Sequence, residues 1–370
     1  MLRLTSAVFV GILFHIYSTQ AQSTFTNPIF DTRSADPAVL RHGNYYYIPL
    51  STNGERQLTL YRSSKLSNFR NADTKVVYNA AEGESDIWAS EMHEVDGQVY
   101  IYFSMRRDDH RVYAIQAEDP NNPMGNWGPV IPIMGNWDRG GIDGTILKHG
   151  NGQQYFSWVT DGALWIARLI NATTVHESRL RLRKDTLDWE CCQNEGAYFF
   201  YHDNVSYMVF SGGDTWDPNY ALGMMSIDGD KDPMNPSHWW FGEEKPVFWR
   251  NDEEDVYGPG HSSFTTSPDG TEIWMVYHGA STPSYTERIA RIDKITFDEN
   301  GKPVFPRPSV IISPKLEIIL VMKLDSSKVA SQLLSPLKIF SGLKLKYFRN
   351  GSDNDTGRAS TCKQFGQERG

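Results

Sequence analysis

The chain has 370 residues, of which 39% are hydrophobic and 22% charged, as in an ordinary folded protein rather than a disordered one. Its 36 Lys and Arg stand against 45 Asp and Glu, so the formal net charge is −9. This charge repels phosphate backbones and argues against nucleic-acid binding. Aromatic residues reach 13%, a content typical of proteins that bind sugars or consist of many β-strands.

Residues 1–21 have the pattern of a secretory signal peptide. Arg3 supplies a positive start, residues 7–16 form an apolar run, and small residues predict cleavage after Ala21. The alternative is a buried N-terminal helix. The run is too short to span a bilayer, and no later segment does so. We therefore expect a secreted, extracellular protein with no membrane attachment once the signal is removed. Four glycosylation sequons agree with export, and they begin at Asn171, Asn204, Asn350 and Asn354.

The cysteine content argues against a disulfide-rich domain and against a zinc-stabilised domain. There are three cysteines, Cys191, Cys192 and Cys362. This number is too low for a disulfide scaffold, and none of the three has zinc-site spacing. The chain must therefore rely on a packed core, and the redox state of the cysteines stays open.

A repeat organises the chain from residue 22 to 308. Five turn-forming segments each precede a strand-like run of aromatic and β-branched residues, which is the pattern of a β-hairpin. The turns lie about 54 residues apart, with a last gap of about 66; they are His42–Asn44, Val95–Gly97, His149–Gly152, His202–Asn204 and Pro268–Gly270. Even spacing of this size predicts an all-β, five-bladed β-propeller. A β-sandwich is the alternative architecture, but it needs no such spacing.

One polar residue lies four to seven positions before the first residue of each turn, on the strand expected to be innermost in its blade. These residues are Asp36, Glu91, Asp143, Glu195 and His261. Because a propeller brings equivalent positions together around one axis, four carboxylates and one imidazole should converge on a central funnel. Buried charges are costly unless they are paired, solvated or functional, so a structural ion or water cluster is the alternative to an active site.

Converging carboxylates suit glycoside hydrolysis. That reaction needs one protonated carboxylic acid at the leaving oxygen and one carboxylate near the anomeric carbon. The two groups must have different pKa values, which burial and neighbouring like charges produce. The sequence thus predicts a sugar-hydrolysing site in the funnel.

Five strings in this order resemble glycoside hydrolase family 43. They are Ser34-Ala35-Asp36-Pro37, Ile87-Trp88-Ala89-Ser90-Glu91, Gly141-Ile142-Asp143-Gly144, Asn194-Glu195-Gly196 and Tyr257-Gly258-Pro259-Gly260-His261. The resemblance covers about residues 27–308 and is closest to the exo-acting α-L-arabinofuranosidases. It implies a five-bladed propeller that acts on arabinan or arabinoxylan of plant cell walls, or on arabino-oligosaccharides. One departure is Ser90, where family members usually carry Pro.

The resemblance also implies roles for individual residues. Asp36 matches the general base, Glu195 the general acid and Asp143 the carboxylate that tunes the acid. Inversion of configuration is implied, with a base–acid separation of roughly 6.5–9.5 Å. Residues matched to substrate binding are Trp88, Glu91, His261 and Arg291. No cofactor is required, although a calcium ion at the propeller axis near His261 is left open; a lone His is a poor calcium ligand.

Three alternatives for the function remain. A β-xylosidase or an endo-1,5-arabinanase would use the same scaffold, and loops such as 213–217 would decide between a blind pocket and an open groove. A sugar-binding propeller without catalysis is the third, although all three matched carboxylates are present. We expect a monomer. Residues 309–370 form an atypical, basic extension that lacks the repeat and looks disordered towards its end.

Overall fold

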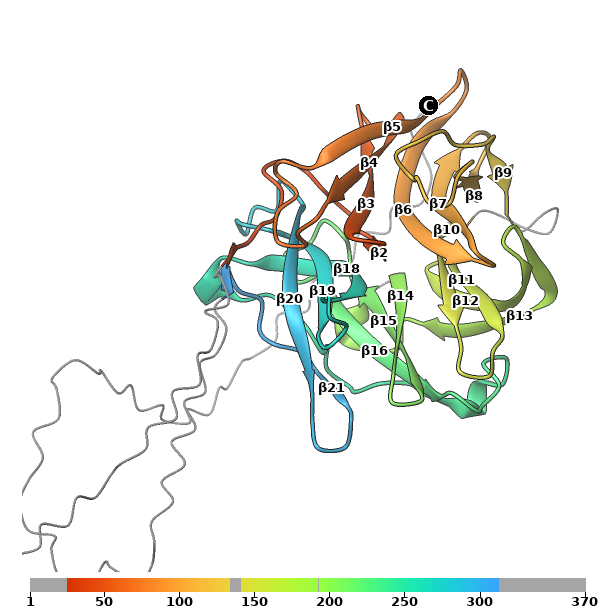
Figure 1. Ribbon diagram of the computed structural model, residues 1–370. Coiled ribbons are helices and arrows are strands. Elements are labelled where there is room, and N and C mark those ends of the chain that lie inside the picture. Colours follow the sequence, from red (N-terminus) through yellow and green to blue (C-terminus); the bar gives the residue numbers. More distant parts are fainter. Residues whose placement is uncertain (1–24, 134–140, 192, 313–370) are drawn as a thin grey trace, which may run out of the picture. The chain divides into compact units, whose positions relative to one another are not determined.

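The computed structural model describes residues 25–133, 141–191 and 193–312, and these residues form the predicted five-bladed β-propeller. Figure 1 shows the sheets following one another in chain order around a common centre, from β2–β5 to β18–β21. The described residues contain no α-helix but only short 3-10 helices. None of these is long and apolar enough to cross a membrane. The signal peptide, two of the sequons, Cys192 and Cys362 lie outside the described residues.

Each blade is a four-stranded antiparallel sheet whose strands pair in chain order. Blade 1 consists of β2 (Leu40–His42), β3 (Tyr45–Thr52), β4 (Gln57–Ser63) and β5 (Asp73–Asn79). Blade 2 consists of β6 (Ser85–Val95), β7 (Gln98–Arg106), β8 (His110–Gln116) and β9 (Ile131–Pro132). Blade 3 consists of β10 (Ile142–Lys148), β11 (Gln154–Thr160), β12 (Ala163–Asn171) and β13 (Thr174–Lys184).

The last two blades follow the same order. Blade 4 consists of β14 (Asn194–His202), β15 (Val205–Gly212), β16 (Ala221–Asp228) and β17 (Trp239–Trp240). Blade 5 consists of β18 (Tyr257–Thr266), β19 (Ile273–Ala280), β20 (Ile289–Phe297) and β21 (Pro303–Val304). Short 3-10 turns lie at Asp188–Glu190, Pro236–His238 and Asp252–Glu254.

The predicted turns join the first two strands of each blade. Asp96 and Gly97 both have positive φ and connect β6 to β7, as a two-residue type I′ turn requires. Asp203 and Asn204 do the same between β14 and β15. The two-residue loops fix the register of the innermost strand against its neighbour, and so fix which of its side chains face the axis.

The core contains five large apolar clusters, each of which fills the space between two neighbouring blades, and a small sixth cluster at blade 5. For example, Tyr102 of blade 2 and Phe156 and Trp158 of blade 3 belong to one cluster. Ile48 of blade 1 and Ile292 of blade 5 belong to another, which joins the first blade to the last. Since every blade shares a cluster with each neighbour, the ring is held by packing rather than by a central plug.

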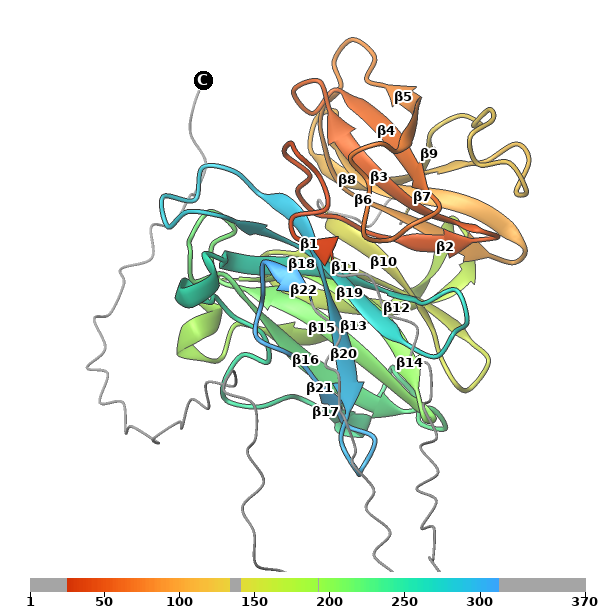
Figure 2. The ribbon, with the colours of Figure 1, turned by 60° about the vertical axis from the view of Figure 1, so that its left-hand side comes forward.

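The ring closes through segments at its two ends. β1 (Phe25–Thr26) pairs with β22 (Ile311–Ile312), and Figure 2 shows the two strands side by side. Asn27 donates to and accepts from the backbone of Ile292 on β20, at 2.8 and 3.0 Å. The propeller therefore extends to Ile312 and not only to residue 308. The rest of the predicted extension lies outside the described residues.

Candidate active site

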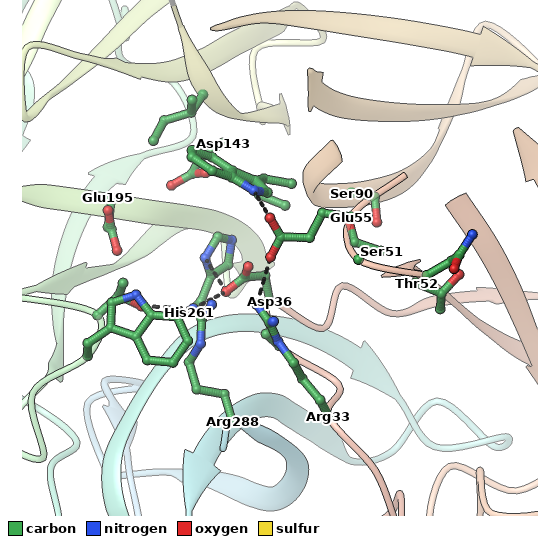
Figure 3. A pocket seen from close by; sticks show the side chains of 18 of the residues that line it. Arg33, Asp36, Ser51, Thr52, Glu55, Ser90, Asp143, Glu195, His261 and Arg288 are labelled. Carbon is green, nitrogen blue, oxygen red and sulfur yellow. Dashed lines mark hydrogen bonds and ion pairs between the residues drawn. The ribbon is translucent and has the colours of Figure 1, made fainter. Parts of the chain in front are cut away.

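A cavity of about 510 Å³ opens over the inner ends of the blades. It is lined by residues from all five blades, including Asp36, Trp88, Asp143, Glu195 and His261. Figure 3 shows the carboxylates of Asp36, Asp143 and Glu195 around one space, with His261 beside Asp36. The structure thus brings together three carboxylates that lie far apart in the sequence.

A residue in the left-handed backbone conformation lies on or just before each innermost strand. This conformation determines where the side chains at that point of the strand are directed. Asp36, Asp143 and His261 have φ of 55°, 55° and 47°. Register shifts occur at the same places in β6, β10, β14 and β18, so each strand carries a bulge there. Bulges re-aim side chains, and here they turn polar groups into the cavity.

Side chains from the preceding blade hold these strained residues in place. The backbone N–H of Asp143 donates to Ser104 Oγ at 3.1 Å, and that of His261 donates to Ser211 Oγ at 2.8 Å. The N–H of Asp36 donates instead to Nδ1 of His278, at 3.1 Å. Neighbouring blades are therefore tied together at the residues that line the cavity.

Asp36 is surrounded by cationic and donor groups. Its Oδ1 lies 3.1 Å from Arg288 Nη1 and 3.3 Å from His261 Nδ1. Burial alone would raise the pKa of Asp36, but Arg288 and His261 outweigh it and hold this pKa well below its usual range. Asp36 is therefore an ionised carboxylate at neutral pH.

The two histidines beside Asp36 have opposite charge states. Burial would lower the pKa of His261, but the carboxylates of Asp36 and Asp143 raise it to about 10, so His261 is an imidazolium. Burial lowers the pKa of His278 to about 4. Because Nδ1 of His278 accepts the Asp36 N–H, its proton sits on Nε2. His278 is therefore a neutral imidazole, and it positions the backbone of Asp36.

Glu195 has the opposite environment from Asp36. Burial, and then the nearby Asp143 carboxylate, raise the pKa of Glu195 to about 8. Tyr220 donates its hydroxyl to Glu195 Oε1 at 2.7 Å, and Gln193 donates to Oε2 at 3.0 Å. These bonds fix the carboxyl group while leaving it protonated at neutral pH.

Asp143 links the acid's strand to the centre of the site. Its Oδ2 accepts the backbone N–H of Gly196 at 2.9 Å. Gly196 has φ of 55°, and a Cβ there would lie 2.9 Å from His261 Cγ. Only glycine allows both this conformation and this approach. Burial also raises the pKa of Asp143, with His261 opposing it.

Comparison with known proteins identifies the arrangement. The model of "Glycosyl hydrolases family 43" matches residues 25–303. The chain belongs to glycosyl hydrolase family 43.

The relatives agree with this membership. An "extracellular exo-alpha-(1->5)-L-arabinofuranosidase" of Streptomyces avermitilis is 28% identical, over 83% of this chain and 70% of the relative. One of the same name from Streptomyces chartreusis is 29% identical, over 69% of this chain and 82% of the relative. The crystal structure of an α-L-arabinofuranosidase from Lactobacillus brevis superposes with a TM-score of 0.71 and 28% identity, covering 77% of this chain and 97% of that one. The chain is thus a glycoside hydrolase of the arabinofuranosidase-like branch.

Trp88 lines the cavity of this family 43 enzyme and is held from two sides. Its Nε1–H donates to Glu55 Oε2 at 2.6 Å, and its ring stacks on His110 with centroids 4.1 Å apart. One face of the indole therefore rests on protein. The position agrees with the sugar-binding role expected for Trp88.

Glu91 does not line the cavity, which corrects the expectation from the repeat. It is only 2% exposed and its Oε2 pairs with His93 Nε2 at 2.7 Å. β6 has two left-handed residues, Asp86 and Ala89, and Ala89 lies in the bulge between Trp88 and Glu91. The position equivalent to Asp36 and Asp143 is therefore Ala89 rather than Glu91. The offset of two residues sends Glu91 into the interior, while Trp88, Ala89 and Ser90 line the cavity.

Arg291 does not line the cavity either, and Arg288 does. Arg288 lies just before β20 (Ile289–Phe297), whereas Arg291 lies within that strand. Arg291 is 1% exposed and donates to Ser281 Oγ. The sequence contained the cavity-lining arginine three residues earlier, immediately before the same strand. His278, Tyr220 and Glu55 were also missed, and no short motif marked them.

The described residues offer the calcium ion left open near His261 no set of ligands. Among residues 25–133, 141–191 and 193–312, no group of three or more His, Cys, Asp or Glu side chains is arranged to hold a metal ion. The imidazolium of His261 directs Nδ1 to Asp36 and so has no lone pair there for a cation.

Proposed function

We propose that this family 43 enzyme is a secreted, inverting α-L-arabinofuranosidase that removes terminal α-L-arabinofuranosyl residues from arabinan or arabinoxylan. The observation that carries the proposal is the contrast between two carboxyl groups in one cavity. The pKa of Asp36 lies well below its usual range and that of Glu195 is raised to about 8. Such a pair supplies one base and one acid at the same pH.

In the proposed reaction, Asp36 is the general base and Glu195 the general acid. Asp36 accepts a proton from a water molecule whose oxygen forms a bond to the anomeric carbon. The bond from that carbon to the glycosidic oxygen breaks, and the oxygen takes the proton of Glu195. Asp143 keeps Glu195 protonated by its negative charge. Configuration at the anomeric carbon is inverted, and no glycosyl-enzyme forms.

The remaining groups bind and orient the sugar. Trp88 offers the free face of its indole to the terminal arabinose, and Arg288 holds Asp36 in its ionised form. His261 adds positive charge beside Asp36 and helps to keep this carboxylate ionised. The contacts described above support these roles. Glu91 and Arg291 do not line the cavity, and we assign them no contact with the sugar.

Two matched substrates separate this proposal from its alternatives. We expect turnover of the 4-nitrophenyl α-L-arabinofuranoside and none, or far less, of the β-D-xyloside. From linear arabinan, arabinose should be the first product, whereas an endo-arabinanase would release oligosaccharides. Asp36→Ala should abolish turnover of both arabinan and the aryl arabinofuranoside, with partial recovery in azide. Binding of arabino-oligosaccharides without turnover would favour the sugar-binding alternative.

Secretion is supported by the signal-like residues 1–21 and by the word "extracellular" in the names of two relatives. Two sequon asparagines, Asn171 and Asn204, are exposed at turns and accessible to glycosylation. Mass spectrometry of the exported protein should find Gln22 at its N-terminus. An N-terminus at Met1 in the culture medium would contradict signal cleavage.

A further inference from the structure

Residues 213–220 form a loop between β15 and β16 that carries a tryptophan on the rim of the cavity. Trp216 is 52% exposed and lines the cavity. Trp240 and Trp249, the other strongly exposed tryptophans of the described chain, are 39% and 46% exposed and are not among the lining residues. The exposed indole at the cavity is therefore a feature of this loop.

The loop is ordered by its own hydrogen bonds. Trp216 N–H donates to Asp214 Oδ1 at 2.9 Å, and Pro218 accepts from the Gly258 N–H at 2.8 Å. Thr215 Oγ1 accepts from Arg288 at 2.9 Å. At the end of the loop, Tyr220 donates to Glu195. Because the loop is fixed before substrate arrives, displaying Trp216 costs little ordering on binding.

Charged side chains join Trp216 to the other tryptophan of the cavity. The Arg288 guanidinium lies 4.5 Å from the centroid of the Trp216 ring, and that of Arg33 lies 5.8 Å away. Arg33 pairs with Glu55 Oε1 at 2.8 Å, and the other oxygen of Glu55 holds Trp88. Figure 3 shows Arg33, Glu55 and Arg288 around Asp36. The two aromatic surfaces thus have a fixed separation, with polar groups between them.

The position of the acid decides which part of a substrate meets Trp216. The anomeric carbon must lie between Asp36 and Glu195, so the leaving oxygen lies at Glu195. The sugar that carries this oxygen then extends towards the rim beside Glu195. That rim includes loop 213–220, which belongs to the same blade as Glu195 and is bonded to it through Tyr220.

We propose that Trp216 forms the binding site for the second sugar, the arabinofuranosyl residue on the leaving side of an α-1,5-linked chain. The C–H face of this sugar packs against the indole, and Arg33 and Glu55 are placed to bind its hydroxyl groups. This proposal rests on the proposed function, and it makes Trp216 a determinant of preference for oligosaccharides over small glycosides.

The test compares two substrates that both need protonation by Glu195. α-1,5-Arabinobiose has a second sugar, and methyl α-L-arabinofuranoside has only a methyl group in its place. Trp216→Ala should lower kcat/KM for arabinobiose about tenfold and for the methyl glycoside less than twofold. Trp216→Phe should recover part of the loss. Trp249→Ala, which removes an exposed tryptophan away from the cavity, should leave both values unchanged.

Several results would overturn the proposal. An equal loss on both substrates in Trp216→Ala would show that the loop supports the site without binding the second sugar. Unchanged kinetics on both, or the same selective loss in Trp249→Ala, would also contradict it. These results leave the proposed function intact. If the wild-type enzyme hydrolyses neither arabinofuranoside, the proposed function itself fails, and this binding site fails with it.

Discussion

Blades 2 and 4 start from similar innermost strands but present different chemistry to the cavity. Each strand carries a bulge at a residue with positive φ, Ala89 in β6 and Gly196 in β14. In β14 the glutamate precedes this residue by one position and lines the cavity. In β6 the glutamate follows it by two positions and is buried against His93. Placement relative to the bulge, rather than residue type, separates a candidate acid from a structural carboxylate.

The largest expected effect distinguishes these two glutamates. Glu195→Gln should lower kcat on arabinan by about 10²–10⁴, the range for loss of a general acid. The loss should be much smaller on the 4-nitrophenyl arabinofuranoside, whose leaving group needs no proton. Glu91→Gln is the matched control and should keep kcat near the wild-type value while lowering Tm by a few degrees. Similar losses on both substrates in Glu195→Gln would contradict its role as acid.

Arg288, just before β20, and Arg291, within it, repeat the comparison in one segment of the chain. Arg288→Met removes a charged hydrogen bond to Asp36, so the pKa of Asp36 should rise and kcat/KM should fall by about 10- to 100-fold. Arg291→Met should affect thermal stability alone, because Arg291 is buried away from the cavity. Steady-state kinetics and thermal unfolding of both variants check this. A fall in kcat/KM for Arg291→Met, with an unchanged value for Arg288→Met, would contradict the assignment of Arg288 to the active site.

The pH profile tests the electrostatic link from Asp143 to Glu195. With a pKa of about 8, Glu195 loses its proton as the pH rises through that value, so kcat/KM should fall above about pH 8. Asp143→Asn removes a negative charge, makes Glu195 easier to ionise, and should move this fall to lower pH. Burial still raises the pKa of Glu195, so the shift should be partial. A profile that does not move would remove Asp143 from this role.

The sequence was informative where the repeat itself determines position. Turn residues such as Asp96-Gly97 predict the hairpins, their spacing predicts five blades, and the fold confirms both. The repeat also predicts that Asp36, Asp143 and Glu195 approach one cavity, and they line it together.

The sequence was less informative at the scale of one or two residues. A bulge changes which face of the sheet the following side chains point to, and it has no clear sequence signal. For this reason the sequence wrongly predicted that Glu91 faces the cavity. The sequence did not show that β20 begins only at Ile289, so it could not tell which of Arg288 and Arg291 lines the cavity. His278 replaces the serine that supports the left-handed residue elsewhere, as Ser104 and Ser211 do, but its partner Asp36 lies 242 residues away. Such partners emerge only from the closed ring.

The anomer released first from arabinobiose tests the central claim most directly. If Asp36 activates water while Glu195 protonates the leaving oxygen, early proton NMR spectra should show β-L-arabinofuranose before it equilibrates. Glu195→Gln should suppress this signal and Glu91→Gln should not. Release of the α-anomer first, or turnover that survives the loss of both Asp36 and Glu195, would contradict the account.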